Sequence, residues 1–150
     1  MDVQLRPVQR QDGSGLVVLL SQLGYPSTEK AVQERLDYWL GDPSNRLVAA
    51  EGGGDLIGVA ALGVLPMLEV TGRLGRLLAL VVDERCRGQG VGQALVMAVE
   101  ELARAAGCVR MEITSSRYRT KTQEFYQQLG YEDVCNSSAR LVKSLADSAV

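Results

Sequence analysis

The sequence contains no histidine, and this absence excludes a whole class of mechanisms. Without an imidazole the chain cannot build a Ser–His or Cys–His couple, and it lacks the commonest metal ligand of proteins. Cysteine is scarce as well, since Cys86, Cys108 and Cys135 stand far apart and form no C-x-x-C pair. Their spacing indicates neither a disulfide framework nor a zinc site, so we expect no metal.

Long hydrophobic runs and an excess of basic residues are also missing. No stretch approaches the roughly eighteen apolar residues that a membrane span needs, and the opening MDVQLRPVQRQDGSG has no apolar core of the signal-peptide type. The 16 basic and 18 acidic side chains give a net charge of −2, whereas nucleic-acid surfaces are usually strongly basic. We therefore expect a cytoplasmic protein that binds neither membranes nor nucleic acid.

What the chain does have is the size and composition of one ordinary domain. Its 150 residues are 46% hydrophobic and 23% charged, which is typical of a globular protein with a sizeable core. No internal repeat or linker-like segment interrupts it. The sequence therefore predicts a single domain that covers residues 1–150.

The most informative stretch runs from Leu77 to Gly92, with the sequence LLALVVDERCRGQGVG. It opens with a fully apolar run whose length suits a strand buried on both faces. A charged break follows, then three glycines at alternate positions, Gly88, Gly90 and Gly92, and then a helical pattern. Helix N-termini present unpaired N–H groups, and glycines let an anion approach them. Strand, glycine loop and helix start together predict a phosphate site.

The spacing of these glycines separates the candidate phosphate ligands. Dinucleotide folds need G-x-G-x-x-G and nucleotide hydrolases need G-x-x-x-x-G-K-[ST], and the chain has neither string. What it has is R-x-x-G-x-G, from Arg87 to Gly92. An ordinary glycine-rich turn between a strand and a helix is the alternative interpretation of so short a motif.

Hydrophobic periodicity and chain breakers predict the element order β-α-α-β-β-β-α-β-α-β-β. Short turns should join the second, third and fourth strands into an antiparallel meander, and the long helix after Gly90 should make the fourth and fifth strands parallel neighbours. The predicted strands cover residues 3–5, 46–51, 56–65, 76–83, 109–114, 131–135 and 140–145. The predicted helices cover residues 16–23, 28–40, 91–106 and 121–129, and residues 11–15 are expected to form a turn.

This order is similar, from end to end, to the fold of the GCN5-related N-acetyltransferases, the GNAT family. The motif from Arg87 to Gly92 resembles the acyl-CoA-binding motif of that family. A second stretch, RTKTQEFYQQLGY from Arg119 to Tyr131, looks like the family's other signature, a helix ending F-Y-x-x-L-G-[FY]. Arg119 stands where family members often carry Asn. Two signatures at the proper separation are much more specific than either alone.

The resemblance implies a mixed α/β fold with acetyl-CoA as cosubstrate. Its sheet would be mostly antiparallel, with about seven strands, a splayed parallel pair at the fourth and fifth strands, and about four flanking helices. A bulge in the central strand would open a gap in which backbone groups of Leu80 and Val82 bind the pantetheine, while the glycine loop binds the pyrophosphate. The cofactor-binding residues implied in this way are Leu80, Val81, Val82, Arg87, Gly88, Gln89, Gly90, Val91, Gly92, Gln93 and Arg119.

The reaction implied by the resemblance is transfer of an acetyl group from acetyl-CoA to a primary amine. The Leu80 N–H would stabilise the oxyanion, and Tyr126 would protonate the leaving thiolate as the general acid. A base is harder to place, because without histidine the candidates are Glu51, Glu69 and Glu112, or a water chain that ends on one of them. Glu69, in the loop before the central strand, is the candidate to test first.

Two other functions compete with this hypothesis. A non-catalytic acetyl-CoA-binding module would bind the cofactor without turnover, and a dinucleotide-binding fold would bind NAD. No motif identifies the acceptor, which could be a small-molecule amine or a protein amine, and none fixes the length of the acyl group. Many members of the GNAT family pair, so the resemblance allows a homodimer.

Overall fold

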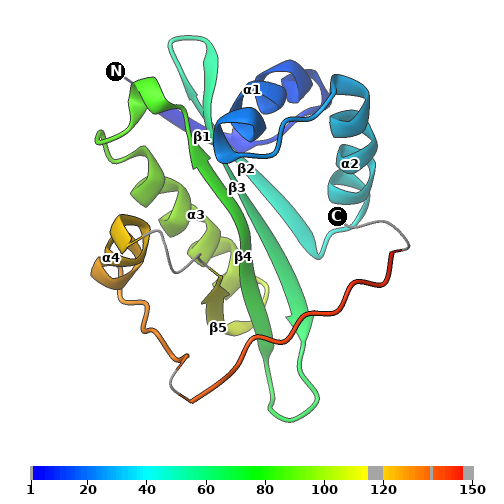
Figure 1. Ribbon diagram of the computed structural model, residues 1–150, viewed down its shortest axis with the longest axis vertical. Coiled ribbons are helices and arrows are strands. Elements are labelled where there is room, and N and C mark those ends of the chain that lie inside the picture. Colours follow the sequence, from blue (N-terminus) through cyan, green and yellow to red (C-terminus); the bar gives the residue numbers. More distant parts are fainter. Residues whose placement is uncertain (1, 115–119, 136, 147–150) are drawn as a thin grey trace. The chain divides into compact units, whose positions relative to one another are not determined.

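The computed structural model describes residues 2–114, 120–135 and 137–146 of the chain. The chain divides into two compact units, which we name the sheet unit (residues 1–114) and the C-terminal unit (residues 115–150). In the described part of the sheet unit, five strands form one sheet in the order β1-β2-β3-β4-β5, accompanied by three α-helices (Figure 1). The described part of the C-terminal unit holds one helix.

The elements match most of the predicted boundaries to within a few residues. The strands are β1 (Val3–Pro7), β2 (Asn45–Gly52), β3 (Asp55–Pro66), β4 (Arg73–Val82) and β5 (Cys108–Ile113). The helices are α1 (Gly13–Leu23), α2 (Glu29–Gly41), α3 (Val91–Ala105) and α4 (Thr120–Gln128), and two short 3₁₀ turns are η1 (Arg10–Asp12) and η2 (Glu84–Cys86).

Local capping sets the ends of the first two helices. α1 ends where Gly24 takes a left-handed conformation, with a φ of 104°, as a glycine after a helix commonly does. Thr28 begins α2, because its hydroxyl accepts the backbone N–H of Ala31 at 3.1 Å. Both helix ends were predicted from these residue types.

The turn expected at residues 11–15 is shorter than predicted. The Asp12 carboxylate accepts the backbone N–H of Gln9 at 2.7 Å and two hydrogen bonds of 2.8 Å from the Arg6 guanidinium. These contacts close η1 as a 3₁₀ turn, and α1 then begins directly at Gly13. An acidic side chain buried beside an arginine therefore replaces the flexible turn that the glycines and serine indicated.

The connections between the strands follow the predicted topology. β2, β3 and β4 form the antiparallel meander, and β4, α3 and β5 form the parallel crossover. Gly53 and Gly54 make the turn between β2 and β3 with φ values of 60° and 83°, the left-handed conformations that a tight hairpin turn requires.

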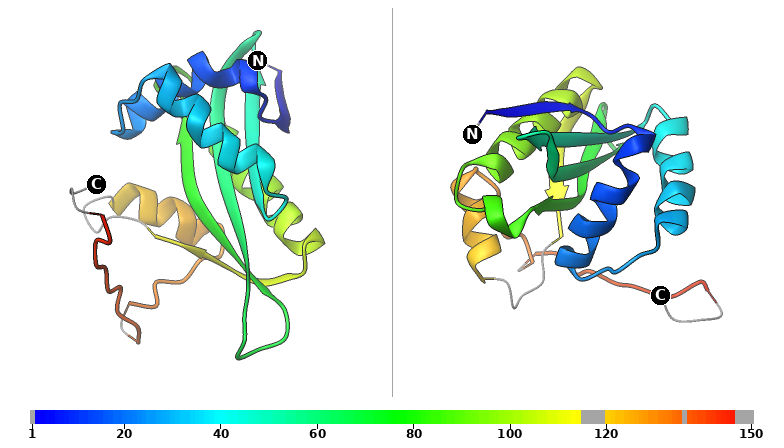
Figure 2. Two further views of the ribbon diagram at one scale, coloured as in Figure 1. Left: turned by 90° about the vertical axis from the view of Figure 1, so that its right-hand side faces the viewer. Right: turned by 90° about the horizontal axis from the view of Figure 1, so that it is seen from above.

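The sheet separates two helical layers (Figure 2). α1 and α2 pack on one face, where Leu19 and Val59 belong to the same buried cluster. α3 packs on the other face, where Leu95 is completely enclosed. Gly58 allows this close approach, because a Cβ added there would stand 3.0 Å from Leu95 Cδ1. Alternate residues of β3 therefore face α1 and α2 or face α3.

The predicted strands at residues 131–135 and 140–145 are wrong, because neither described segment joins a sheet. In the first, the Asp133 carboxylate accepts the Cys135 N–H at 3.0 Å, and the Val134 carbonyl accepts two hydrogen bonds from Ser137 and two from Ser138. Such local bonds compete with strand pairing. In the second, the apolar side chains stay uncovered. The sheet therefore has five strands rather than about seven among the described residues.

Candidate active site

β4 loses its parallel partner half-way along its length. Its pairing with β5 runs from Arg73 to Leu77, where Leu77 lies opposite Ile113. No described residue of β5 pairs with β4 beyond that point. The upper half of β4, residues 78–82, therefore presents an open edge on the side of β5.

A bulge lies at the point where β4 and β5 part. Leu77 pairs with Leu62 of β3 and Ala79 pairs with Ala61, so Leu78 is one residue too many. An extra residue bends its strand and increases its twist, which directs the upper half of β4 away from β5. The Leu78 side chain is 55% exposed, so the prediction that this whole run is buried on both faces is wrong at Leu78.

The backbone groups at the open edge belong to Leu80 and Val82. The Asp83 N–H donates to the Ile57 carbonyl of β3 at 2.7 Å. Because neighbouring residues of a strand direct their N–H and C=O groups to opposite edges, Val81 also faces β3, and Leu80 and Val82 face away from it. Of the three predicted β4 positions, two therefore present backbone groups to the gap, while the third buries its side chain beneath α1 and α2.

The glycine loop after β4 is exposed and left-handed at two positions. Gly88 and Gly90 have φ values of 78° and 82°, and no heavy atom lies within 4 Å of the place where a Cβ would stand. α3 begins immediately after Gly90, and its first helical hydrogen bond runs from the Ala94 N–H to the Gly90 carbonyl. The N–H groups of residues 91–93 are thus the free donors of this helix start.

Arg87 ties the glycine loop to the end of β4. Its Nε donates to the Val82 carbonyl at 3.1 Å, while the side chain stays exposed. This bond uses one of the backbone groups at the open edge and directs the arginine across the top of the gap. Arg87 therefore contributes a positive charge between the strand edge and the helix start, the two places predicted to meet the cofactor.

Asp83, at the end of β4, fixes the turn that leads into the glycine loop, and no motif in the sequence predicted this role. The side chain is 3% exposed, and it accepts the Arg85 backbone N–H at 3.0 Å and the Arg85 guanidinium at 2.9 Å. Those two bonds from Arg85 lower the pKa of Asp83 to about 2. From α1, the Gln22 carbonyl oxygen accepts the Glu84 N–H at 2.9 Å. An aspartate directly after an apolar run and before a short turn is a capping signal that could have revealed it.

Tyr126 lies on α4 in the C-terminal unit. Its ring makes edge contacts with Phe125 and Tyr131, with ring centroids 5.1 and 5.9 Å apart. Burial raises the pKa of Tyr126 to about 12. The phenol therefore keeps its proton at neutral pH and remains able to donate it. Arg119, the other predicted residue of this segment, lies outside the described residues.

Comparison with known proteins decides the family. The family described as Acetyltransferase (GNAT) family matches residues 16–131 of the chain. That range includes β4, the glycine loop and Tyr126.

The chain belongs to the GNAT family.

Three relatives and one solved structure that the chain resembles are named as N-acetyltransferases. Glucosamine 6-phosphate N-acetyltransferase of Trypanosoma brucei brucei is 37% identical over 79 residues, 52% of each chain. Glucosamine 6-phosphate N-acetyltransferase 1 of Oryza sativa subsp. japonica is 30% identical over 85% of this chain and 80% of its own length. Aminoalkylphosphonate N-acetyltransferase of Salmonella typhimurium is 27% identical over 95% and 91%. A solved aminoglycoside N-acetyltransferase in complex with CoA shares the fold, with a TM-score of 0.81, 21% identity and coverage of 98% and 96%.

Membership confirms three expectations drawn from the resemblance. The chain is an acetyl-CoA-dependent N-acetyltransferase, acetyl-CoA is its cosubstrate, and the mixed sheet with a parallel β4–β5 pair is the GNAT fold. Among the described residues, no group of three or more cysteine or acidic side chains could hold a metal ion. Within the same residues, no helix is long and apolar enough to cross a bilayer.

The structure does not bring the three candidate bases of this GNAT protein to Leu80. The Glu51 carboxylate accepts a hydrogen bond from Arg6 at 3.2 Å. Glu112 lies between two arginines. Glu69 is exposed in the loop before β4, and the start of β4 lies about 23 Å from Leu80 at the usual rise of a strand. Two of the three are thus paired with arginines, and the third precedes the far end of β4.

A cavity of about 190 Å³ lies at the other end of α3. Leu102 and Ala106 line it together with Arg46 and Arg73 of the sheet. Because α3 begins at the glycine loop and this cavity adjoins its last turn, the cavity is not part of the predicted phosphate site.

Proposed function

We propose that the chain transfers an acetyl group from acetyl-CoA to a primary amine by direct attack, with Tyr126 as the general acid. One observation carries this proposal: the open edge of β4 leads straight to the unpaired N–H groups at the start of α3. A strand edge offers donors and acceptors that suit amide groups, and a helix N-terminus suits a pyrophosphate. The two features follow one another in the order in which those groups occur in CoA.

The proposed contacts use mostly the backbone. Leu80 and Val82 pair with the amide groups of the pantetheine, while the N–H groups from Gly88 to Gln93 bind the pyrophosphate. Arg87 adds a positive charge above the gap, and Gln93, exposed in the first turn of α3, adds a side-chain donor. Arg119 contacts the CoA, as the family resemblance implies.

The proposed reaction forms one bond and breaks another. The neutral amine attacks the thioester carbonyl, the C–N bond forms, and the oxyanion accepts a hydrogen bond from the Leu80 N–H. The C–S bond then breaks, and Tyr126 gives its proton to the departing thiolate. The amine loses one proton to water, and water returns one proton to the Tyr126 phenolate. Glu69, distant from Leu80 along the strand, receives that proton only through a chain of water molecules.

Titration with acetyl-CoA tests the cofactor part of this proposal. We expect acetyl-CoA to bind and NAD to give no heat under the same conditions, because the glycine spacing does not match a dinucleotide site. Release of free CoA thiol with a panel of small amines then tests transfer. Binding without turnover across the panel would favour a non-catalytic acetyl-CoA-binding module, and no binding would contradict the assignment of the glycine loop.

The acceptor, the compartment and the assembly state complete the proposal. The relatives named above act on small amines, so we propose a small-molecule amine rather than a protein amine. The cytoplasmic location and the homodimer stay predictions. Activity of cell fractions and the molar mass in solution would test them.

A further inference from the structure

Three charged side chains form a cluster on β4 and β5 just below the point where the strands part. Arg76 and Glu112 lie directly opposite one another, and Arg76 Nη2 donates to Glu112 Oε1 at 3.1 Å. From the next outward-facing position of β5, Arg110 Nε lies 3.2 Å from Glu112 Oε2. We name these three residues the arginine cluster. One carboxylate therefore holds two guanidinium groups side by side.

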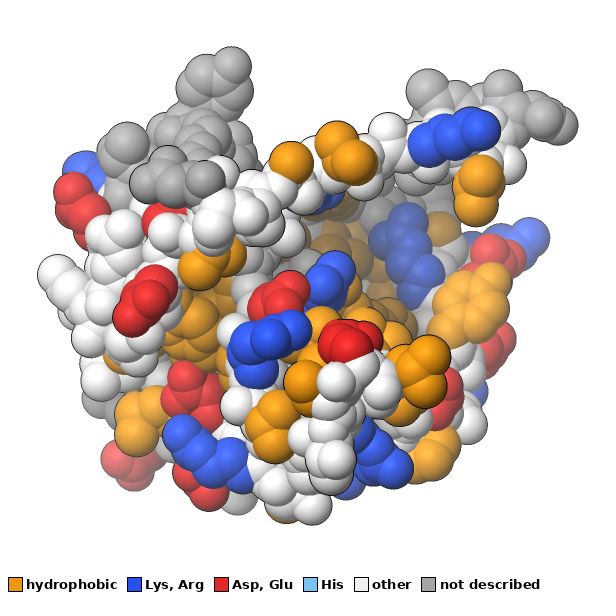
Figure 3. Space-filling model, turned by 90° about the horizontal axis from the view of Figure 1, so that it is seen from below, with side chains coloured by type: hydrophobic (Ala, Val, Ile, Leu, Met, Phe, Trp, Pro, Cys, Tyr) orange, Lys and Arg blue, Asp and Glu red, His pale blue; other side chains and the backbone are white. Residues whose placement is uncertain are grey.

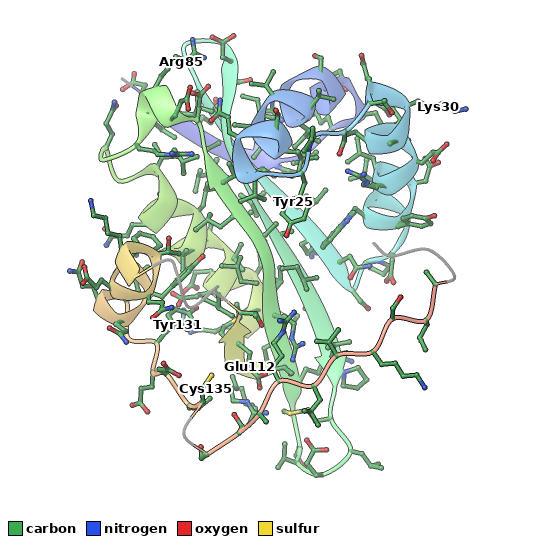
Figure 4. All side chains as sticks on the ribbon, in the orientation of Figure 1. Tyr25, Lys30, Arg85, Glu112, Tyr131 and Cys135 are labelled. Carbon is green, nitrogen blue, oxygen red and sulfur yellow. The ribbon has the colours of Figure 1, made fainter. Side chains whose placement is uncertain are left out.

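The arginine cluster faces the side of the sheet opposite α3. Arg76 pairs with Gly63 of β3, which lies four positions from Val59 and so shares the face that α1 and α2 cover. The cluster lies beyond the part that those helices cover, because its side chains remain 41% to 56% exposed. Figure 4 shows Glu112 beside the lower half of β4, and Arg85 at the opposite end of the strand.

The cluster carries one more positive charge than negative and has donors to spare. Arg76 Nε is buried, and no described residue accepts a hydrogen bond from it. The other contact of Arg110 is a long one, 3.8 Å from Nη2 to Met67 Sδ. Each guanidinium has five N–H donors, so the contacts to Glu112 leave most of them unused. Figure 3 shows that basic and acidic side chains lie next to each other at this end of the molecule.

We propose that the arginine cluster binds an anionic group, a phosphate, phosphonate or carboxylate, carried by the acceptor amine. This inference rests on the proposed function, which places the thioester carbonyl at Leu80. Arg76 lies four strand positions before Leu80, about 13 Å along β4, and its long side chain shortens that span. An acceptor with its amine at one end and its anionic group at the other fits this spacing. Two guanidiniums disfavour polycationic amines, which would meet like charge.

The two arginines have different parts in this recognition. Arg76 is the better placed, because its backbone adjoins the last β4–β5 pair and its unpaired Nε lacks an acceptor. Arg110 is more exposed and supplies the second half of a bidentate grip. Glu112 is then a positioning residue, which holds both guanidiniums in place and does not touch the substrate.

Titration of the CoA-saturated protein with inorganic phosphate tests the site without turnover. We expect the Nε–H NMR signal of Arg76 to shift in a saturable way at millimolar phosphate. The signal of Arg104, an exposed arginine on α3 paired with Glu101, is the matched control and should not move. Equal shifts of both signals, or the same shift in chloride at equal ionic strength, overturns the proposal.

Matched acceptors test the consequence for catalysis. We expect glucosamine 6-phosphate to have at least tenfold higher kcat/KM than glucosamine, with Arg76→Gln and Arg110→Gln each removing most of this advantage through KM. Arg76→Lys keeps the charge but not the planar guanidinium and should retain part of the kcat/KM advantage. Arg104→Gln should retain all of that advantage. A preference for the neutral amine, or unchanged KM in both glutamine variants, overturns the proposal.

The two proposals fail in different experiments. Loss of acetyl-CoA binding in the wild-type protein contradicts the proposed function, whereas the phosphate titration reads the arginine cluster itself. If glucosamine 6-phosphate is not a substrate, the proposal still requires the saturable shift at Arg76, and its absence overturns it. The acetyl-CoA Kd of Arg76→Gln should equal that of the wild type, since the arginine cluster lies below the cofactor gap.

Discussion

Tyr126 shows how burial suits a side chain to one of two chemical roles. A phenol whose pKa is raised from 10 to about 12 by burial is a weaker acid but stays protonated across the physiological range. A departing thiolate needs a proton and not a base, so this direction of shift agrees with the proposed role. A proton acceptor at the same position would need the opposite shift.

Replacing Tyr126 by Phe should lower kcat by about 100-fold or more, the usual range for loss of a general acid. The acetyl-CoA Kd should change less than twofold, because the ring stays. Since the phenol loses its proton only near pH 12, wild-type turnover should not decline between pH 8 and 10. Steady-state rates across this pH range, with Tyr131→Phe as the control variant, check the kcat and the pH dependence, and calorimetry checks the Kd. More than half of the wild-type kcat in Tyr126→Phe would remove the residue from the mechanism.

Asp83 acts on stability at the residue scale. Asp83→Asn should lower the free energy of unfolding by about 1–3 kcal/mol at pH 7, because a buried charged acceptor loses its partner bonds. The folded pKa lies near 2 against an ordinary 3.8, so the carboxylate stabilises the fold above pH 4 and loses that contribution as the pH falls toward 2. Urea unfolding at pH 7 and at pH 3 measures the difference in the free energy of unfolding between the variant and the wild type.

The exposed neighbour provides the control for that measurement. Glu84→Gln should change stability by less than about 0.5 kcal/mol. A gap that stays constant from pH 7 to pH 3 would show that the Asp83 carboxylate is not the group responsible.

At the scale of an element, two glycines with matched backbones separate conformation from binding. Gly90 and Gly54 have φ values of 82° and 83°, and neither has a heavy atom within 4 Å of an added Cβ. Alanine at either position should therefore cost about 1–2 kcal/mol of stability for its left-handed conformation. Only Gly90→Ala should also weaken acetyl-CoA binding, at least tenfold by calorimetry. Equal binding by the two variants would contradict the phosphate site.

The bulge in β4 makes a second prediction at this scale. Deleting Leu78 brings Leu77 and Ala79 together without changing any other β3–β4 pair, so the variant should fold with a regular strand. It should lose acetyl-CoA binding by about 100-fold, equivalent to roughly 2.7 kcal/mol, because β4 no longer bends away from β5. Leu78→Ala keeps the extra residue and should bind within about threefold. Normal binding by the deletion variant would disprove the role of the bulge.

Sequence patterns predicted the elements that local chemistry determines. Glycines at the ends of helices, such as Gly24 and Gly107, have the left-handed φ values of 104° and 87° that their positions indicated. The bulge was not predictable from composition, because LLALVV is uniformly apolar and has no period that could mark Leu78 as extra. The predicted C-terminal strands were wrong for another reason, because Asp133 and the serines offer the backbone local hydrogen bonds that compete with strand pairing.

The parts of the candidate site that depend on backbone conformation could be predicted from the sequence. The parts that depend on contacts between side chains of distant residues could not. The role predicted for Gly88 to Gly92 rests on their residue types alone. The burial of Asp83 depends on Arg85 and on α1, and the pairing of Glu112 with Arg76 depends on strand register. Such contacts between distant residues leave no local pattern in a single sequence.

For the whole molecule, acetyl-CoA should act as a stabilising ligand. At a hundredfold excess over its Kd it should raise the free energy of unfolding by about 2.7 kcal/mol, which corresponds to roughly 6–10 °C in Tm for a protein of this size. NAD at the same concentration should leave Tm unchanged. Thermal unfolding followed by circular dichroism measures both. A Tm that does not depend on acetyl-CoA would contradict binding to the folded state.

The open edge of β4 also bears on how this protein tolerates mutation. Its proposed contacts to pantetheine come from N–H and C=O groups, which every amino acid except proline supplies alike. Substitutions at Leu80 or Val82 that preserve an apolar strand therefore leave these backbone groups in place, so other apolar residues should be tolerated at both positions. Insertions and deletions are different, because one residue more or less shifts the direction of every group beyond it. In this strand, the proposed recognition therefore depends on the count of residues more than on their identity.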